Sequence, residues 1–289
     1  MARALVLGLC LLSSAASAAD MAVKARPLPQ PFFSWTGFYA GLNVGYGTSR
    51  SSSFNDPVDP VSQFLFTNRF APTDFTSAFR QSGVIAGGQA GYNLQFSERF
   101  VAGLEADFQY SDVRARNFSQ AFIDADPTAG FNVFAERRLK WFGTVRGRLG
   151  VLVTPDLLLY GTGGLAYGET LTSGDIIFAP TVPGTVQNQV NGVSFRCGPV
   201  SPVTCYTGSN NQTDFGWTAG AGGELRIGGN WTAKLEYLHV DLPGTSVTLI
   251  SPPPSSAGVS TIFRFNHQSY DFVRIGMNYK FGGPIVASY

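Results

Sequence analysis

The sequence has few charged residues, few cysteines and no long apolar run after its first residues. Asp, Glu, Lys and Arg together make up 13% of the 289 residues, about half of the share that soluble proteins usually carry. Charge this scarce indicates a surface that contacts lipid as well as water. The 20 basic and 19 acidic residues nearly cancel, so no basic surface for nucleic acid and no acidic disordered tail is expected.

No segment of the mature chain approaches the roughly 20 consecutive apolar residues that a transmembrane helix requires. The one apolar stretch, residues 4–12, follows Arg3 and precedes a small-residue cleavage site. It therefore predicts a signal peptide over residues 1–18. The proline-rich residues 19–34 are expected to form a flexible lead-in, and residues 35–289 a single domain.

Glycine (34 residues) and phenylalanine (24 residues) are abundant, and they occur in segments where apolar and polar residues alternate. In residues 100–111, the even-numbered positions from Phe100 to Tyr110 are apolar, whereas the odd-numbered ones include Glu105 and Asp107. An alternation with period two predicts a β-strand with one apolar face. Eight such segments are expected, at residues 35–47, 81–96, 100–111, 139–153, 157–168, 215–227, 231–241 and 269–281.

The connections between these segments alternate in length. Tight turns join the second to the third, the fourth to the fifth and the sixth to the seventh. Residues 48–80, 112–138, 169–214 and 242–268 form the long connections. This alternation is typical of outer-membrane barrels with short periplasmic turns and long extracellular loops. The predicted fold is therefore all-β: an eight-stranded antiparallel up-and-down transmembrane β-barrel with four long extracellular loops.

The apolar face of each strand must contact lipid, because a charge there costs about 2–4 kcal/mol near the bilayer midplane. In the fourth segment this places Leu139, Trp141, Val145, Leu149 and Val151 outside. Aromatic residues at the strand ends are expected at the two membrane interfaces. They are Trp35, Phe96, Phe100, Trp141, Trp231 and Phe281.

Nine charged residues are predicted to point inward, where eight strands leave just enough room for side chains. We expect opposite charges there to pair, because unpaired buried charges are costly. The paired charges would then close the barrel as a structural plug. A narrow pore that opens when the pairs rearrange is the alternative. The predicted set is Glu105, Asp107, Arg146, Arg148, Glu224, Arg226, Lys234, Glu236 and Arg274.

The sequence predicts no catalytic site, metal site or cofactor. Paired carboxylates alone, without a nucleophile or a histidine partner, do not make an active site. Cys197 and Cys205 are expected to form a disulfide, since the chain is exported and few other ligands for a metal lie near them. His239 and His267 could bind metal or haem as a pair, but two unrelated interfacial histidines are the favoured interpretation.

Five stretches of the mature chain carry a resemblance to a known family: WTGFYAGLNVGY (35–46), GVIAGGQAGY (83–92), LYGTGGLAY (159–167), GWTAGAGGE (216–224) and VRIGMNYKF (273–281). With them, the sequence resembles the porin-family small outer-membrane β-barrel proteins of alphaproteobacteria. These are the outer-membrane immunogenic proteins, which are OmpA-like eight-stranded barrels. The resemblance implies the cell outer membrane as location. The alternation of short and long connections predicts that both termini lie in the periplasm.

The resemblance also implies a barrel-insertion signal, because the last strand of these proteins usually ends the chain with an aromatic residue. Here Tyr279 and Phe281 lie in the last predicted strand, yet the chain continues to Tyr289. The signal is therefore either internal at Phe281 or carried by Tyr289. The expected partners during insertion are periplasmic chaperones and the barrel-assembly machinery.

Two functions from different classes follow. The first is a structural and surface-interaction role, with the long loops presented outside the cell to extracellular ligands and the barrel in contact with outer-membrane lipid and lipopolysaccharide. The alternative is a small passive, porin-like pore for ions or small polar solutes, although wide aqueous channels need about sixteen strands. A haemin- or ligand-binding surface receptor is a weaker third possibility. No nucleic acid partner is expected.

Overall fold

The computed structural model describes residues 33–60, 62–63, 77–123, 126–178, 187–190, 193–196, 203–251 and 259–282. Nearly all of these residues are in β-strands. Among them, no helix has the length and hydropathy needed to cross a membrane.

Twelve strands are present in the described part of the chain. They are β1 (Gly37–Pro57), β2 (Ser77–Gln95), β3 (Phe100–Ile123), β4 (Asp126–Thr154), β5 (Leu157–Phe178), β6 (Gln187–Val190), β7 (Val193–Arg196), β8 (Val203–Gly228), β9 (Trp231–Leu242), β10 (Thr245–Ile250), β11 (Ser260–Phe265) and β12 (Gln268–Lys280).

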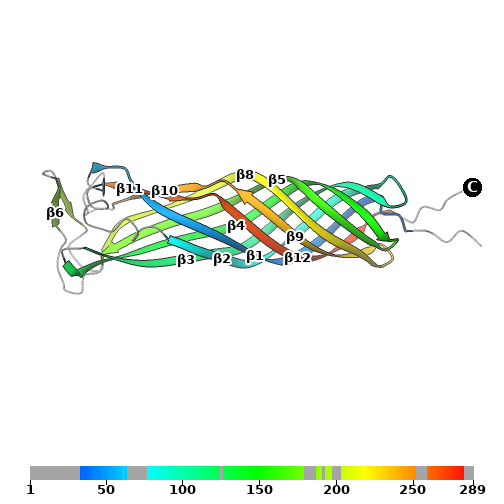
Figure 1. Ribbon diagram of the computed structural model, residues 1–289, viewed down its shortest axis with the longest axis horizontal. Coiled ribbons are helices and arrows are strands. Elements are labelled where there is room, and N and C mark those ends of the chain that lie inside the picture. Colours follow the sequence, from blue (N-terminus) through cyan, green and yellow to red (C-terminus); the bar gives the residue numbers. More distant parts are fainter. Residues whose placement is uncertain are drawn as a thin grey trace, which may run out of the picture.

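Eight of the strands form a ring. They pair antiparallel in the order β1-β12-β9-β8-β5-β4-β3-β2, and β1 pairs again with β2, so that the pairing returns to its start. Figure 1 shows these strands as a long tilted bundle with the tight turns at one end. The first residues of β1 and the last of β12 lie at this same end, because Tyr39 is the partner of Lys280.

Two of the remaining strands lengthen the ring at its far end. β11 pairs with β1, and β10 pairs with both β11 and β8. Residues 260–265 are thus a strand extension, as their alternation indicates. β6 and β7 form a separate two-stranded sheet.

The strands are much longer than the sequence predicts at the end away from the tight turns. β3, β5 and β9 begin at the predicted residues Phe100, Leu157 and Trp231, but β3 continues to Ile123 and β4 already begins at Asp126. The prediction of a long loop over residues 112–138 is therefore wrong. Tight turns are predicted at residues 97–99, 154–156 and 228–230, and consecutive strands are connected there, by residues 155–156 and 229–230 in the last two cases.

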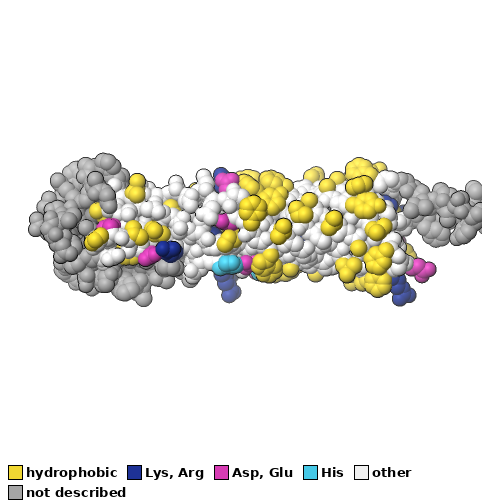
Figure 2. All heavy atoms as spheres, turned by 90° about the horizontal axis from the view of Figure 1, so that it is seen from above, with side chains coloured by type: hydrophobic (Ala, Val, Ile, Leu, Met, Phe, Trp, Pro, Cys, Tyr) yellow, Lys and Arg dark blue, Asp and Glu magenta, His cyan; other side chains and the backbone are white. Residues whose placement is uncertain are grey.

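An apolar belt surrounds the half of the ring near the tight turns. On β3 it runs from Phe100 to Tyr110, which matches the roughly 9–11 residues of a strand that crosses a bilayer. Figure 2 shows this band of hydrophobic side chains between charged residues at both of its edges. Other belt residues are Phe38, Leu42, Val44, Tyr46, Val84, Tyr92, Leu94, Val145, Leu149, Leu165, Phe215, Trp217, Leu225, Leu235, Val273, Ile275 and Met277.

Beyond the belt, the polar and apolar faces of β3 are exchanged. On β3, Asp112 and Arg114 lie outside, whereas Val113 and Ala115 are buried in the interior. The odd-numbered residues of β3 point inward from Glu105 to Ala115, so the strand keeps its phase and only the polarity of its two faces changes. Above the belt, water replaces lipid around the exterior, so polar residues face out and apolar residues face in.

A change of phase on β4 corrects one prediction. The register with β5 shifts between Leu139 and Trp141. Leu139 is consequently 0% exposed and points inward, although the sequence pattern places it outside, whereas Leu149 is 62% exposed as predicted. A bulge at one residue moves every following side chain to the opposite face.

Two apolar clusters fill the interior above and below its middle. The lower cluster, near the tight turns, contains Trp35, Val101, Leu152, Leu158 and Tyr160. Trp35 is 2% exposed, and its indole N–H donates to the carbonyl of Pro155 at 3.1 Å. The prediction that Trp35 lies at a membrane interface is therefore wrong. The segment before β1 folds into the mouth of the strand ring and buries the indole of Trp35.

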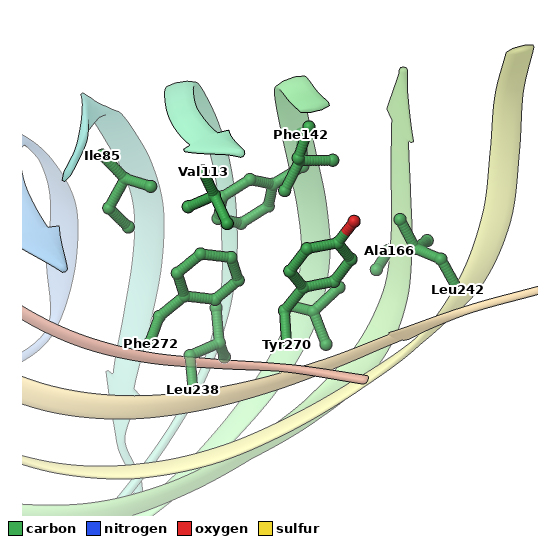
Figure 3. Packing of buried hydrophobic residues seen from close by; sticks show 10 residues of the cluster. Ile85, Val113, Phe142, Ala166, Leu238, Leu242, Tyr270 and Phe272 are labelled. Carbon is green, nitrogen blue, oxygen red and sulfur yellow. The ribbon is translucent and has the colours of Figure 1, made fainter. Parts of the chain in front are cut away.

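The upper apolar cluster lies on the other side of the middle and is drawn in Figure 3. Its rings and aliphatic side chains point toward one another from opposite strands, with Phe142 stacked on Phe272 at 4.6 Å between ring centroids. The sequence predicts a polar interior throughout, and this cluster corrects that expectation. Its members are Ile85, Val113, Leu139, Phe142, Ala166, Leu238, Val240, Leu242, Tyr270 and Phe272.

Candidate functional site

Eight buried charged residues meet in the interior between the two apolar clusters. We call them the charge network: Glu105, Asp107, Arg146, Arg148, Glu224, Lys234, Glu236 and Arg274, none more than 4% exposed. Four are cationic and four anionic, so their formal charges cancel. Glu105 lies midway between Phe100 and Tyr110, which places the network halfway up the apolar belt.

The strand register builds the network from cross-strand pairs. Glu105 is the direct partner of Arg146, Glu224 of Lys234 and Glu236 of Arg274. Each residue is on the inward face because of the alternation of its strand. Opposite charges at directly paired positions stabilise a sheet, so the sequence encodes both the burial and the partners.

Arg146 is the centre of one half of the network. Its guanidinium donates to Asp107 Oδ2 at 2.8 Å, to Glu236 Oε1 at 3.0 Å and also to Glu105. The bond to Glu236 joins β4 to β9, which are not neighbours in the ring, and so crosses the interior. Arg274 donates to Glu236 Oε2 at 2.5 Å and to Asp107 Oδ2 at 2.8 Å, which closes a cycle of ion pairs.

Arg148 is the centre of the other half. It donates to Glu224 Oε2 at 2.7 Å, and its guanidinium lies 3.9 Å from the centroid of the Tyr160 ring. Glu224 also accepts hydrogen bonds from Thr232 and from Asn278. Buried charges are tolerated when their remaining donors and acceptors are satisfied in this way.

Glu105 connects the two halves, since it pairs with Arg146 and lies 3.9 Å from the guanidinium of Arg148. It also pairs with Lys234, whose ammonium lies 3.2 Å from Glu105 Oε1 and 3.7 Å from Glu236 Oε2. Glu105 additionally accepts a hydrogen bond from the Tyr39 hydroxyl at 2.7 Å. This arrangement holds each of these charges beside an opposite charge.

Arg226 is the one predicted network residue that the structure places elsewhere. It lies two residues from the end of β8, at the mouth near the tight turns. There its guanidinium pairs with Asp156 at 3.2 Å, and its side chain is 33% exposed. The alternation of β8 directs it inward, as predicted. At the mouth, however, it is partly exposed to water and pairs with the turn residue Asp156.

Tyr39 and Tyr160 belong to the site although sequence reasoning did not select them. Each lies opposite an inward glycine: a Cβ added at Gly91 would be 2.5 Å from the Tyr39 hydroxyl, and one at Gly222 would be 2.7 Å from that of Tyr160. Inward glycines paired with inward tyrosines are the signal that could have identified them.

The other predicted site residues lie apart from the network. Tyr279 and Phe281 are exposed at the lower edge of the belt with their rings 5.4 Å apart. Tyr289 and Cys197 lie outside the described residues, and Cys205 is fully buried and disulfide-bonded. The insertion signal and the Cys197–Cys205 pairing stay predictions.

The two histidines have separate partners. His239 contacts Asp271 at 2.8 Å and packs beside Trp217, whereas His267 lies 3.3 Å from Asp241. Within the described residues, no three His, Cys, Asp or Glu side chains come together to hold a metal ion.

At the far end of the ring, Tyr206 is buried beside Ser62. Its hydroxyl lies 3.0 Å from the Ser62 hydroxyl, and burial raises its pKa above the ordinary value for tyrosine. The phenol therefore stays neutral throughout the physiological range, and it serves as a hydrogen-bonding partner.

The fold and the belt define a class of protein, and the comparisons agree with it. Residues 7–281 match the model of the outer membrane protein beta-barrel domain, so the chain belongs to this family. It is 34% identical over 275 residues to the 31 kDa outer-membrane immunogenic protein of Brucella melitensis biotype 1, covering 94% of this chain and 95% of the relative. It is thus an outer-membrane β-barrel protein of the immunogenic outer-membrane protein family.

Two further comparisons are more distant. The 22 kDa outer membrane protein of Rhizobium leguminosarum bv. viciae is 30% identical over 212 residues, which cover 73% of this chain and 66% of that protein. Among solved structures, the outer membrane protein OprG from Pseudomonas aeruginosa has a TM-score of 0.46 and 14% identity, covering 86% of this chain and 97% of OprG.

Proposed function

We propose that the chain forms an eight-stranded antiparallel up-and-down transmembrane barrel that does not conduct and has no enzymatic activity. Its role is structural: it anchors the long upper strands and the connections between them outside the cell, where they contact extracellular ligands. The observation that carries the proposal is the closed interior. The charge network fills its middle, and an apolar cluster lies on either side of it.

The positions of the tight turns and of the ends of the ring support the proposed orientation. The tight turns and both ends of the ring lie on one side, which we assign to the periplasm. The signal peptide (residues 1–18) and lead-in (residues 19–34) would precede the barrel domain (residues 35–289). The upper strands, with water-facing polar residues above the belt, would project from the cell, and periplasmic chaperones and the barrel-assembly machinery would insert the chain.

A small pore for ions or polar solutes is less well supported. A conducting path would have to pass Trp35, the charge network and the Phe142–Phe272 stack, all of which fill the same interior. Rearranging the ion pairs alone would leave both apolar clusters in place.

The orientation can be tested by single cysteines in intact cells. Ser209→Cys lies on an exposed position of β8 above the belt, and Ser97→Cys lies in a tight turn. A membrane-impermeant maleimide should label the first in intact cells and the second only after the outer membrane is permeabilised. Labelling of Ser97→Cys in intact cells would overturn the orientation.

A further inference from the structure

Two arginines lie side by side on the exterior just above the apolar belt. Arg50 on β1 and Arg80 on β2 are direct partners in the antiparallel register, and both side chains are exposed. Directly opposed residues have Cβ atoms about 5 Å apart, and like charges in that arrangement destabilise a sheet. An anion between or beside the two guanidinium groups would offset this repulsion.

Other exterior cations above the belt already have such an anion from the protein. Five of them lie within 4.0 Å of a carboxylate: Arg114, Arg116, Arg138, Lys140 and Arg264. In the part of the chain that the structure describes, no carboxylate lies within this distance of Arg50 or Arg80. Among the described residues, the two arginines thus differ from their neighbours in having no carboxylate within this distance.

The arginines border a hollow of about 500 Å³ that also contains Thr48, His267 and Asp271. The carboxylate of Asp271 accepts hydrogen bonds from the Tyr237 hydroxyl at 2.5 Å and contacts His239 at 2.8 Å. Both groups lie on β9 and contact the same oxygen, Oδ1. The hydroxyl of Thr48 lies between the belt and Arg50 on the same face of β1.

The height of the hollow relative to the belt indicates its ligand. The belt ends at Tyr46, whose partners Val84 and Val273 are exposed apolar residues. Arg50 is four residues further along β1, which on a tilted strand is roughly 10 Å above Tyr46. At this height the exterior of a barrel meets the phosphate-bearing headgroups of the surrounding lipid, and arginine side chains can extend toward them.

We propose that Arg50 and Arg80 form a binding site for a phosphate group of the phosphorylated glycolipid (lipopolysaccharide) in the outer leaflet. Two planar guanidinium groups can each donate two hydrogen bonds to phosphate oxygens, which suits arginine better than lysine. The site rests on the proposed orientation, which puts the upper edge of the belt in the outer leaflet. It makes this face of the barrel, over β1 and β2, the one that holds an ordered lipid.

The test compares two charge-matched double variants refolded in a maltoside detergent, which carries no phosphate. Arg50→Gln/Arg80→Gln removes the proposed site. Arg116→Gln/Arg138→Gln removes the same charge from two arginines, on β3 and β4, that are each ion-paired with a carboxylate. Binding of diphosphoryl lipid A is measured by native mass spectrometry, with dephosphorylated lipid A and inorganic phosphate as further probes. The shift of folded barrels on unheated gels verifies that each variant has folded, independently of binding.

We expect lipid A to bind the site variant at least about tenfold more weakly than the wild type, since hydrogen bonds to charged groups are lost. The control variant should bind within about twofold of the wild type, and dephosphorylated lipid A should bind all three equally weakly. Equal weakening in both double variants would overturn the site in favour of diffuse electrostatic attraction. Displacement of lipid A by millimolar inorganic phosphate would overturn the lipid as its ligand and leave a free-anion site.

Discussion

Removal of the Arg146 guanidinium should destabilise the barrel more than removal of any exposed arginine. Arg146→Ala deprives Glu105, Asp107 and Glu236 of a shared donor and leaves four buried anions with three cations. Breaking a buried ion pair by removing one partner costs about 3–5 kcal/mol, because the remaining charge is left without compensation. We expect a loss of this size in the free energy of unfolding.

The assay is equilibrium urea unfolding in phospholipid vesicles, followed by tryptophan fluorescence. Arg116→Ala is the control: its partner Glu136 lies 3.0 Å away, but the Arg116 side chain is 74% exposed, and such pairs contribute about 0–1 kcal/mol. Arg146→Lys keeps the charge and loses the forked geometry, so it should fall between the two. A loss below about 1 kcal/mol for Arg146→Ala, equal to that of the control, would refute the network as a buried, mutually compensated set.

Three further predictions concern the apolar clusters and the disulfide. Trp35→Ala should lower the free energy of unfolding by about 3–5 kcal/mol in the same urea assay, because a buried ring is replaced by a cavity; an unchanged midpoint would place Trp35 at the lipid surface. Leu139→Ala should cost about 2–5 kcal/mol and the lipid-facing Leu149→Ala clearly less, whereas equal losses would contradict the change of phase on β4. In the denatured mature protein, Cys197 and Cys205 should react with a maleimide only after reduction, and labelling without reductant would exclude their disulfide.

The alternation of the membrane-crossing segments could be predicted because lipid imposes it on every strand. Residues 100–111 show this most clearly: each outward position is apolar or small, and the inward Glu105 and Asp107 are polar. The same pattern identified eight of the nine charges as members of one inward set. The prediction that Arg226 joins this set was wrong, because the alternation along a strand gives the direction of a side chain and does not give its height in the barrel.

The upper strands could not be predicted from the same pattern. Above Tyr110, water replaces lipid, so the outward residues of β3 become polar and the inward ones apolar, while the strand keeps its phase. A prediction that requires apolar residues on one continuous outward face ends the strand there, and it assigns the following residues to a loop. Leu139 was misplaced for a different reason: β4 changes phase at a bulge between Leu139 and Trp141, so Leu139 points inward whereas Leu149 points outward.

The apolar clusters inside the ring were also beyond sequence reasoning. Phe142 and Phe272 are far apart in the chain, and only the closure of the ring brings their faces together at 4.6 Å. Trp35 precedes the first strand, so its position depends on how the segment bends into the mouth. Neither contact has a local signal in the sequence.

Single-channel recording in a planar bilayer tests the closed interior most directly. The chain from residue 19 onward is refolded and compared with an Arg146→Ala/Arg148→Ala variant. We predict no steady conductance in either, because the clusters around Trp35 and around Phe142 and Phe272 close the interior on both sides of the charges. Steady conductance of the wild type, with altered ion selectivity in the variant, would contradict the closed barrel and establish a small pore.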